Sequence, residues 1–214
     1  MFTDRLEAGS LLAQKLNQYK DQHGVVLAVP RGGVPLGYIV ARDLNLPLEL
    51  LLSKKIGHPE NEEYAIGAAS LTDRYLSSRV HVSPEYIEAE TARVRARLQA
   101  MKEKFIGDHQ PESLEGKTVI VIDDGIATGL TLMGSIQMLR SQKPKKIVIA
   151  VPVAPRGTLD KISQAADEVV CLLIPEEFYG VGAFYENFEQ VSDEEVLYYL
   201  KKHREEYVGV GKAA

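Results

Sequence analysis

The chain of 214 residues is long enough for one substantial α/β domain with a large buried core. Its residues are 45% hydrophobic and 26% charged, which is typical of globular proteins and excludes the disordered and fibrous classes. The formal net charge of -5 at pH 7 lacks the basic signature of a protein that binds a nucleic-acid backbone, so no nucleic-acid partner is expected.

The first part of the chain predicts two helices and two strands. Leu6, Leu12, Leu16 and Tyr19 recur at helical spacing and predict an amphipathic helix over the first twenty residues. The β-branched run 25–29 ends at a proline and is typical of a buried parallel strand, and a glycine loop then opens a second helix. A second strand is expected over 48–55. The segments near 65–71 and 75–82 favour either a hairpin or a loop.

The second part of the chain alternates strands and helices. Ser83, Pro84 and Glu85 form a strong helix start, because serine can cap, proline fits the first turn and glutamate suits the dipole. This helix should continue to about residue 105. Strands are then expected at 117–124, 145–153 and 168–175, and helices at 131–142, 157–166 and after Ser192. The alternation indicates a parallel sheet covered by helices on both faces, in one domain over residues 1–214.

The stretch IVIDDGIATGLTL, residues 120–132, places two carboxylates and a loop of small residues directly after a buried strand. Ligands of open parallel sheets bind at the carboxyl ends of the strands. The loop N–H groups, the hydroxyls of Thr128 and Thr131 and the following helix start favour a bound monophosphate. No lysine follows the glycines, so a Walker-type ATPase is not expected. Asp123 and Asp124 would repel that phosphate, and we expect them to face hydroxyls, a metal or developing positive charge.

The stretch VIVIDDGIATGLT resembles the signature of the type I phosphoribosyltransferases. The sequence Arg31-Gly32-Gly33 after the first strand resembles the pyrophosphate loop of the same family. The resemblance implies a parallel-sheet α/β fold with helices on both faces, a helical lid-like insertion and a small C-terminal hood. It also implies an enzyme that uses phosphoribosyl pyrophosphate (PRPP) and Mg2+ to transfer the phosphoribosyl group to a nucleobase or similar nitrogen nucleophile, releasing pyrophosphate.

The same resemblance assigns roles to individual residues. Asp123 and Asp124 would be catalytic, holding the ribose hydroxyls and stabilising the positive charge of the transition state. Lys54 and Lys55 would reach the pyrophosphate, although charged residues at a solvated strand end explain them equally well. Mg2+ is expected to arrive bound to PRPP, without a direct protein ligand. The expected PRPP-binding residues are Arg31, Gly32, Gly33, Lys54, Lys55, Gly125, Ile126, Ala127, Thr128, Gly129, Leu130 and Thr131.

Base recognition in the family comes from a variable hood, expected here at about residues 175–191. The aromatic faces of its rings could stack on a flat heterocycle, and an amide could bind the edge of that heterocycle. Packing of two or three of these rings in the core explains them equally well. The interval 72–116 stands where the family has a mobile lid, but it contains a predicted helix, so its role stays open. The candidate base-binding residues are Phe178, Tyr179, Phe184, Tyr185 and Asn187.

Two other functions remain open at this stage. One is a catalytically silent module that binds PRPP or a nucleotide for regulation. The other is a Mg2+-dependent sugar-phosphate hydrolase, although no nucleophile arrangement such as Asp-x-Asp is evident. The single cysteine, Cys171, and the lack of a signal-like or membrane-length apolar run predict a cytoplasmic protein without a membrane partner. Homodimers are common in the family, which makes a homodimer an open expectation.

Overall fold

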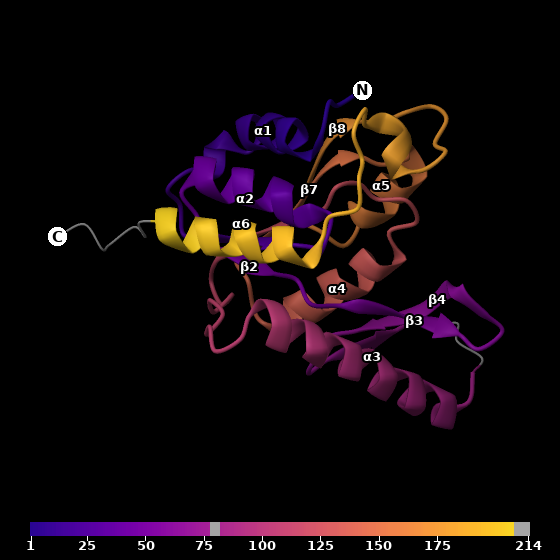
Figure 1. The fold of residues 1–214 in the computed structure, drawn as a ribbon. Coiled ribbons are helices and arrows are strands. Elements are labelled where there is room, and N and C mark those ends of the chain that lie inside the picture. Colours follow the sequence, from indigo (N-terminus) through magenta and orange to yellow (C-terminus); the bar gives the residue numbers. More distant parts are fainter. Residues whose placement is uncertain (78–81, 208–214) are drawn as a thin grey trace. The chain divides into compact units, whose positions relative to one another are not determined.

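The computed structural model describes residues 1–77 and 82–207, which divide into two compact units (Figure 1). The first unit comprises Met1–Leu51, Pro111–Thr128 and the described part of Pro144–Ala214. The second comprises Leu52–Gln110, without the residues outside the description, and Gly129–Lys143. No glycine- or proline-rich linker in the sequence marks the division, because the chain passes from one unit to the other and back more than once.

The first unit is built on a parallel sheet, which confirms the predicted fold class. Its described strands run in the order β2-β1-β6-β7-β8. β1 lies between β2 and β6, with Ala28 paired to Leu50 on one side and to Ile122 on the other. All residues of β1 and β6 are buried, as their apolar runs predict. The strands are β1 (Gly24–Ala28), β2 (Leu48–Leu50), β6 (Thr118–Ile122), β7 (Lys146–Val153) and β8 (Glu168–Leu173).

Helices cover the sheet of the first unit on both faces. The crossover from β1 to β2 and the crossover from β7 to β8 run in opposite directions along the sheet, so right-handed connections place their helices on opposite faces. α1 and α6 both pack against α2, which explains why α2 is almost wholly buried (Figure 1). No helix in the described residues is long and apolar enough to span a membrane. The helices are α1 (Arg5–Lys15), α2 (Gly33–Leu44), α5 (Arg156–Ile162) and α6 (Asp193–Glu206).

The N-terminal helix is shorter than expected. Asp4 caps α1 by accepting hydrogen bonds from the N–H groups of Leu6 and Glu7. α1 ends at Lys15, and a 3-10 turn η1 (Asn17–Tyr19) follows. Leu12 is buried as predicted, but Leu6 is 37% exposed because it lies beside a surface pocket rather than over the core.

The single strand expected over 48–55 is wrong. β2 stops at Leu50, and Leu51 makes one further hydrogen bond, from its N–H to the carbonyl of Ala28. β1 also ends at Ala28, shortly before Pro30, so the residues after Leu51 have no neighbouring strand to pair with. Lys54 consequently begins another strand, in the second unit.

The second unit is an antiparallel sheet with two helices packed on it. β3 (Lys54–His58), β4 (Asn61–Ala69) and β5 (Arg74–Leu76) pair in that order, which confirms the hairpin alternative for this region. α3 (Pro84–Phe105) and α4 (Leu130–Ser141) both contact this sheet. Ser83 caps α3 as predicted, accepting from the N–H of Tyr86. Residues 78–81, within the predicted segment 75–82 and lid 72–116, lie outside the described residues.

The start of the chain pairs with the hood. Phe2 forms a parallel bridge with Tyr185, in which its N–H donates to the carbonyl of Phe184 and its carbonyl accepts from Glu186. The hood contains a short 3-10 helix, η2 (Val181–Phe184), and lies between β8 and α6 in the sequence. Two segments at opposite ends of the sequence are therefore joined beside the sheet.

Candidate active site at the ends of strands β1 and β6

The carboxyl ends of β1 and β6 form the switch point of the sheet. From β1 the chain proceeds to β2 on one side, and the later strands β6, β7 and β8 extend on the other side. Open α/β sheets bind ligands at such a point. Arg31-Gly32-Gly33 follows β1 and Asp123-Asp124 follows β6. The two sequence motifs therefore meet at one edge of the sheet.

The contact between these motifs requires glycine. A Cβ atom at Gly32 would overlap Oδ2 of Asp124, and one at Gly33 would lie 2.6 Å from the carbonyl oxygen of Ile122. The N–H of Gly33 donates to the carbonyl of Val29 at 2.9 Å, which ties the loop to the end of β1. The Pro30–Arg31 peptide bond is cis. Gly32 and Gly33 thus allow the loop backbone to lie directly against the acid pair.

Asp123 is a partly buried acid whose surroundings disfavour its charge. Its Oδ1 accepts a hydrogen bond from the N–H of Asp124 at 2.9 Å. Burial raises the pKa of Asp123 well above its usual range, and the nearby carboxylate of Asp124 raises it further. Ionised Asp123 would be stabilised by any cation or hydroxyl donor that a ligand brings to this edge.

Asp124 differs because it has a cationic partner, Arg5. Nε and Nη2 of Arg5 lie 3.0 and 2.9 Å from Oδ2 of Asp124. Burial raises the pKa of Asp124, and the guanidinium of Arg5 opposes that shift. The hydroxyl of Tyr185 donates to the backbone carbonyl of Asp124 at 2.7 Å. Arg5 was not among the predicted site residues, because it begins the first helix and belongs to no motif.

The loop after the acids is fixed at its middle. The N–H of Ile126 donates to the carbonyl of Val153 at 3.0 Å, and the hydroxyl of Thr158 donates to the carbonyl of Ala127 at 2.7 Å. A Cβ at Gly125 would lie 2.5 Å from a methyl group of Val181, so the hood packs on the start of this loop. Thr128 is exposed.

The remainder of the motif belongs to the second unit. Gly129 adopts the left-handed conformation with φ 71° just before α4, and no described side chain caps this helix. Leu130 and Thr131 form the first turn of α4, where backbone N–H groups lack helical partners. The loop therefore leads into a helix start of the kind that binds anions.

The predicted pyrophosphate ligands have protein partners of their own. Nε of Arg31 lies 2.9 Å from Oδ1 of Asp193, at the start of α6, and the Arg31 side chain is 43% exposed. Lys54 and Lys55 lie in β3 of the second unit, paired with Ala69 and Ala68 in the antiparallel ladder. Pyrophosphate binding by these side chains stays a prediction.

Most of the hood aromatics pack against one another. Phe178 and Phe184 stack with centroids 5.6 Å apart. Tyr185 is 5% exposed, with its ring 5.4 Å from that of Phe2 and 4.9 Å from that of Phe188. The core-packing alternative therefore describes Tyr185, whose ring is covered in this structure.

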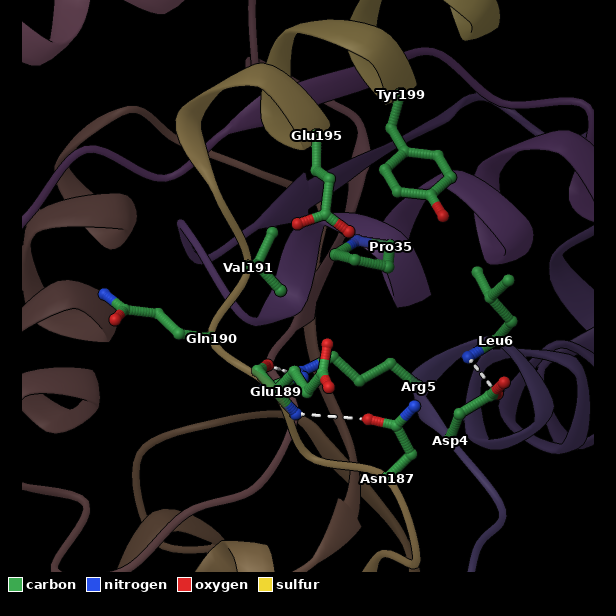
Figure 2. A pocket seen from close by; sticks show the side chains of 10 residues that line it. All are labelled: Asp4, Arg5, Leu6, Pro35, Asn187, Glu189, Gln190, Val191, Glu195 and Tyr199. Carbon is green, nitrogen blue, oxygen red and sulfur yellow. Dashed lines mark hydrogen bonds between the residues drawn. The ribbon is translucent and has the colours of Figure 1, made fainter.

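The other two candidate base-binding residues lie at the surface. Tyr179 is 82% exposed, and its hydroxyl donates to the carboxylate of Glu177. Asn187 lines a surface pocket, and its side-chain oxygen accepts from the N–H of Glu189 at 3.3 Å (Figure 2). Base binding by the hood residues stays a prediction.

The acid pair suits a particular kind of metal binding. Within residues 1–77 and 82–207, no group of three or more histidine, cysteine, aspartate or glutamate side chains could hold a metal ion. Asp123 and Asp124 supply adjacent carboxylates. Mg2+ in proteins is often bound by one or two carboxylates together with the phosphates of a substrate and water. The donor set therefore fits Mg2+ that is shared with a phosphorylated ligand.

The comparison with solved structures supports this fold. The crystal structure of TT1426 from Thermus thermophilus has a TM-score of 0.85 and 35% sequence identity, covering 94% of this chain and 98% of that one. The AQ2163 protein from Aquifex aeolicus has a TM-score of 0.52 at 14% identity, over 83% of this chain and 78% of that one. The Aquifex structure supports the fold alone.

The comparison with protein sequences identifies the family. Proteins from two strains of Mycobacterium tuberculosis, each named "Putative phosphoribosyl transferase", are 37% identical over 99% of this chain. That match covers 49% of each relative, so the chain spans about half their length. The model of the phosphoribosyl transferase domain matches residues 4–188. The chain therefore belongs to the phosphoribosyl transferase domain family.

Proposed function

We propose that the protein transfers the phosphoribosyl group of PRPP to a ring nitrogen of a nucleobase or a similar nucleophile and releases pyrophosphate. The observation that supports this most strongly is the direct contact of Gly32 and Gly33 with the acid pair at the switch point of the sheet. A diphosphate-binding loop, a ribose-binding acid pair and a phosphate loop would then share one edge, as one molecule of PRPP requires.

The acids would act on the sugar. In the reaction the bond from carbon 1 to the pyrophosphate oxygen breaks, and a bond from carbon 1 to the acceptor nitrogen forms. The ribose ring carries positive charge in between, which ionised Asp123 and Asp124 would stabilise electrostatically. Because Asp123 has a raised pKa, positive charge brought by the ligand would favour its ionised form.

The loops would act on the phosphates. Main-chain N–H groups of residues 125–131 would hold the 5-phosphate, assisted by the hydroxyls of Thr128 and Thr131. The Gly32–Gly33 backbone and Arg31 would hold the pyrophosphate, and Arg31 would exchange its contact with Asp193 for the ligand. These fixed contacts would keep carbon 1 and the acceptor nitrogen in line.

Mg2+ is part of the proposal. Asp123 and Asp124 would be the residues closest to it, through water, and the phosphate oxygens of PRPP would supply its direct ligands. When bound, the ion supplies charge neutralisation for the departing pyrophosphate.

Pyrophosphate release tests the proposed function. Purified protein is incubated with PRPP, Mg2+ and a panel of purine and pyrimidine bases, and pyrophosphate is measured with a coupled assay. We expect release that depends on one class of base and that falls at least about 100-fold in Asp124→Asn, which removes a charge with little change in volume. Asp160→Asn on α5 is the matched control, because Asp160 is exposed and lies outside both motifs.

The outcomes of the same assay separate the other functions. Tight binding of PRPP by calorimetry without turnover on any base would favour a regulatory binding module. Release of inorganic phosphate without a base would favour a sugar-phosphate hydrolase. The absence of both PRPP binding and turnover would contradict the proposed function.

A further inference from the structure

We propose that Arg5 is a positioning residue for Asp124, fixing one oxygen of this carboxylate and leaving the other for the ligand. The effect of Arg5 on catalysis rests on the proposed function, whereas its effect on Asp124 does not. Arg5 lies outside both sequence motifs, on the first helix.

The geometry of Arg5 is that of a fixed bridge. Two of its nitrogens, Nε and Nη2, reach the same oxygen of Asp124, at 3.0 and 2.9 Å. The third, Nη1, donates to the backbone carbonyl of Glu189 at 2.7 Å. The guanidinium lies 3.9 Å from the ring centroid of Phe188, and the Arg5 side chain is 11% exposed. A planar guanidinium with all three nitrogens engaged has little freedom to move.

The carboxylate of Asp124 has two close neighbours. Arg5 binds Oδ2, and the backbone of Gly32 lies so near that a Cβ atom there would overlap the same oxygen. Rotation of the carboxylate would break the charge-assisted hydrogen bond from Nε of Arg5 and the ion pair with Nη2. Oδ1 makes neither of these Arg5 contacts, and it is the oxygen that we assign to a ribose hydroxyl.

The position of Arg5 argues for a role beyond stabilising the helix. Arg5 is the first residue of α1, where the helix dipole disfavours a positive charge. The cost of that placement is offset by its contact with Asp124. Arg5 also joins the acid to the hood through Glu189 and Phe188, so it would couple the sugar site to the segment expected to bind the acceptor.

A surface pocket makes this arrangement accessible to chemical rescue. Arg5 lines a pocket together with Asn187 and Glu189, as Figure 2 shows. The volume of this pocket is about 170 Å³. Truncation to alanine would enlarge the pocket toward Asp124. Guanidinium ion added to the solution could then occupy the place of the missing side chain.

The test compares Arg5→Ala, Arg5→Lys and the control Arg42→Ala. Arg42 is also an arginine with a carboxylate partner, Asp43, and an aromatic neighbour, Tyr38, but it lies near the end of α2, and among the described residues its ion pair and ring contact involve no site residue. Three properties are measured: the titration of Asp124 by carboxyl 13C NMR, the affinity for PRPP with Mg2+ by calorimetry, and the pH dependence of kcat/KM.

We expect Arg5→Ala to raise the pKa of Asp124 and to weaken PRPP binding about tenfold or more, because a hydrogen-bonded charge partner is lost. The acidic limb of kcat/KM should move to higher pH. Guanidinium added to the solution should restore part of the lost PRPP affinity in Arg5→Ala. It should leave the affinity of the wild type unchanged. Arg5→Lys should be intermediate, because lysine keeps the charge but not the planar geometry. Arg42→Ala should leave all three properties unchanged.

An unchanged Asp124 titration with unchanged PRPP affinity in folded Arg5→Ala would overturn the proposal, whatever its melting temperature. If Arg5→Ala does not fold, the Asp124 titration and the PRPP affinity of Arg5→Lys decide instead. If wild-type protein binds no PRPP, the proposed function fails, and the Asp124 titration alone then decides whether Arg5 positions this acid.

Discussion

The substitution Gly32→Ala tests the contact between the two motifs. Gly32 has φ -58° and ψ -34°, a conformation that alanine adopts without strain. The backbone alone would therefore favour alanine by about 0.4–1 kcal/mol, through the lower entropy of the unfolded chain. A Cβ at this position would, however, overlap Oδ2 of Asp124.

The steric cost should exceed the gain. Forcing an extra carbon into a packed site costs about 1–3 kcal/mol. Moving the carboxylate of Asp124 would also strain its ion pair with Arg5. This pair is largely buried, because the side chain of Asp124 is 15% exposed and that of Arg5 is 11% exposed. We expect a net destabilisation of about 0.5–2.5 kcal/mol, which lowers the melting temperature of a protein of this size by about 1–10 °C. The affinity for PRPP should fall about tenfold or more, because the displaced acid no longer fits the ribose.

The control is Gly157→Ala in α5. A Cβ at Gly157 would have no neighbour within 4 Å, so this variant should be stabilised by up to about 1 kcal/mol. Thermal unfolding and calorimetry with PRPP are compared for the two variants. A Gly32→Ala variant that is as stable as Gly157→Ala and binds PRPP as the wild type does would show that Gly32 does not lie against Asp124.

Three further predictions each concern a single residue. Asp193→Asn should free Arg31 and raise the affinity for pyrophosphate up to about fivefold, since a partly exposed ion pair is worth about 1 kcal/mol; weaker binding by calorimetry would contradict this. Burial lowers the pKa of His203, so the unfolded chain binds a proton first and stability should decline as pH falls below about 6.5. Melting temperatures between pH 5 and 8 should show this decline in the wild type and less of it in His203→Gln. Gly129→Val should weaken PRPP binding and lower the melting temperature, because valine tolerates φ 71° poorly; unchanged calorimetry would count against the phosphate loop.

The features that the sequence predicted correctly are local ones. The apolar runs of β1 and β6 follow directly from strand periodicity, and the cap at Ser83 is a three-residue pattern. The expected place of the motif, at the end of β6, needed only the rule for parallel sheets. Such signals lie within a few residues, and tertiary packing did not override them.

The features that the sequence did not reveal depend on distant contacts. The break after Leu51 is set by the end of the neighbouring strand β1. For Tyr185 the sequence left base stacking and core packing open, because its ring contacts Phe2 from the other end of the sequence. Arg5 reaches Asp124 across 119 positions of the chain. Its one local signal is an arginine directly after the helix cap, where the dipole disfavours positive charge.

A crystal structure of the wild-type protein with PRPP and Mg2+ would show whether the loop after β6 binds the sugar phosphate. We expect the 5-phosphate on the main-chain N–H groups of residues 125–131, with the ribose hydroxyls at Asp123 and at Oδ1 of Asp124. PRPP bound elsewhere, with this loop empty and both carboxylates remote from the ribose, would contradict this expectation.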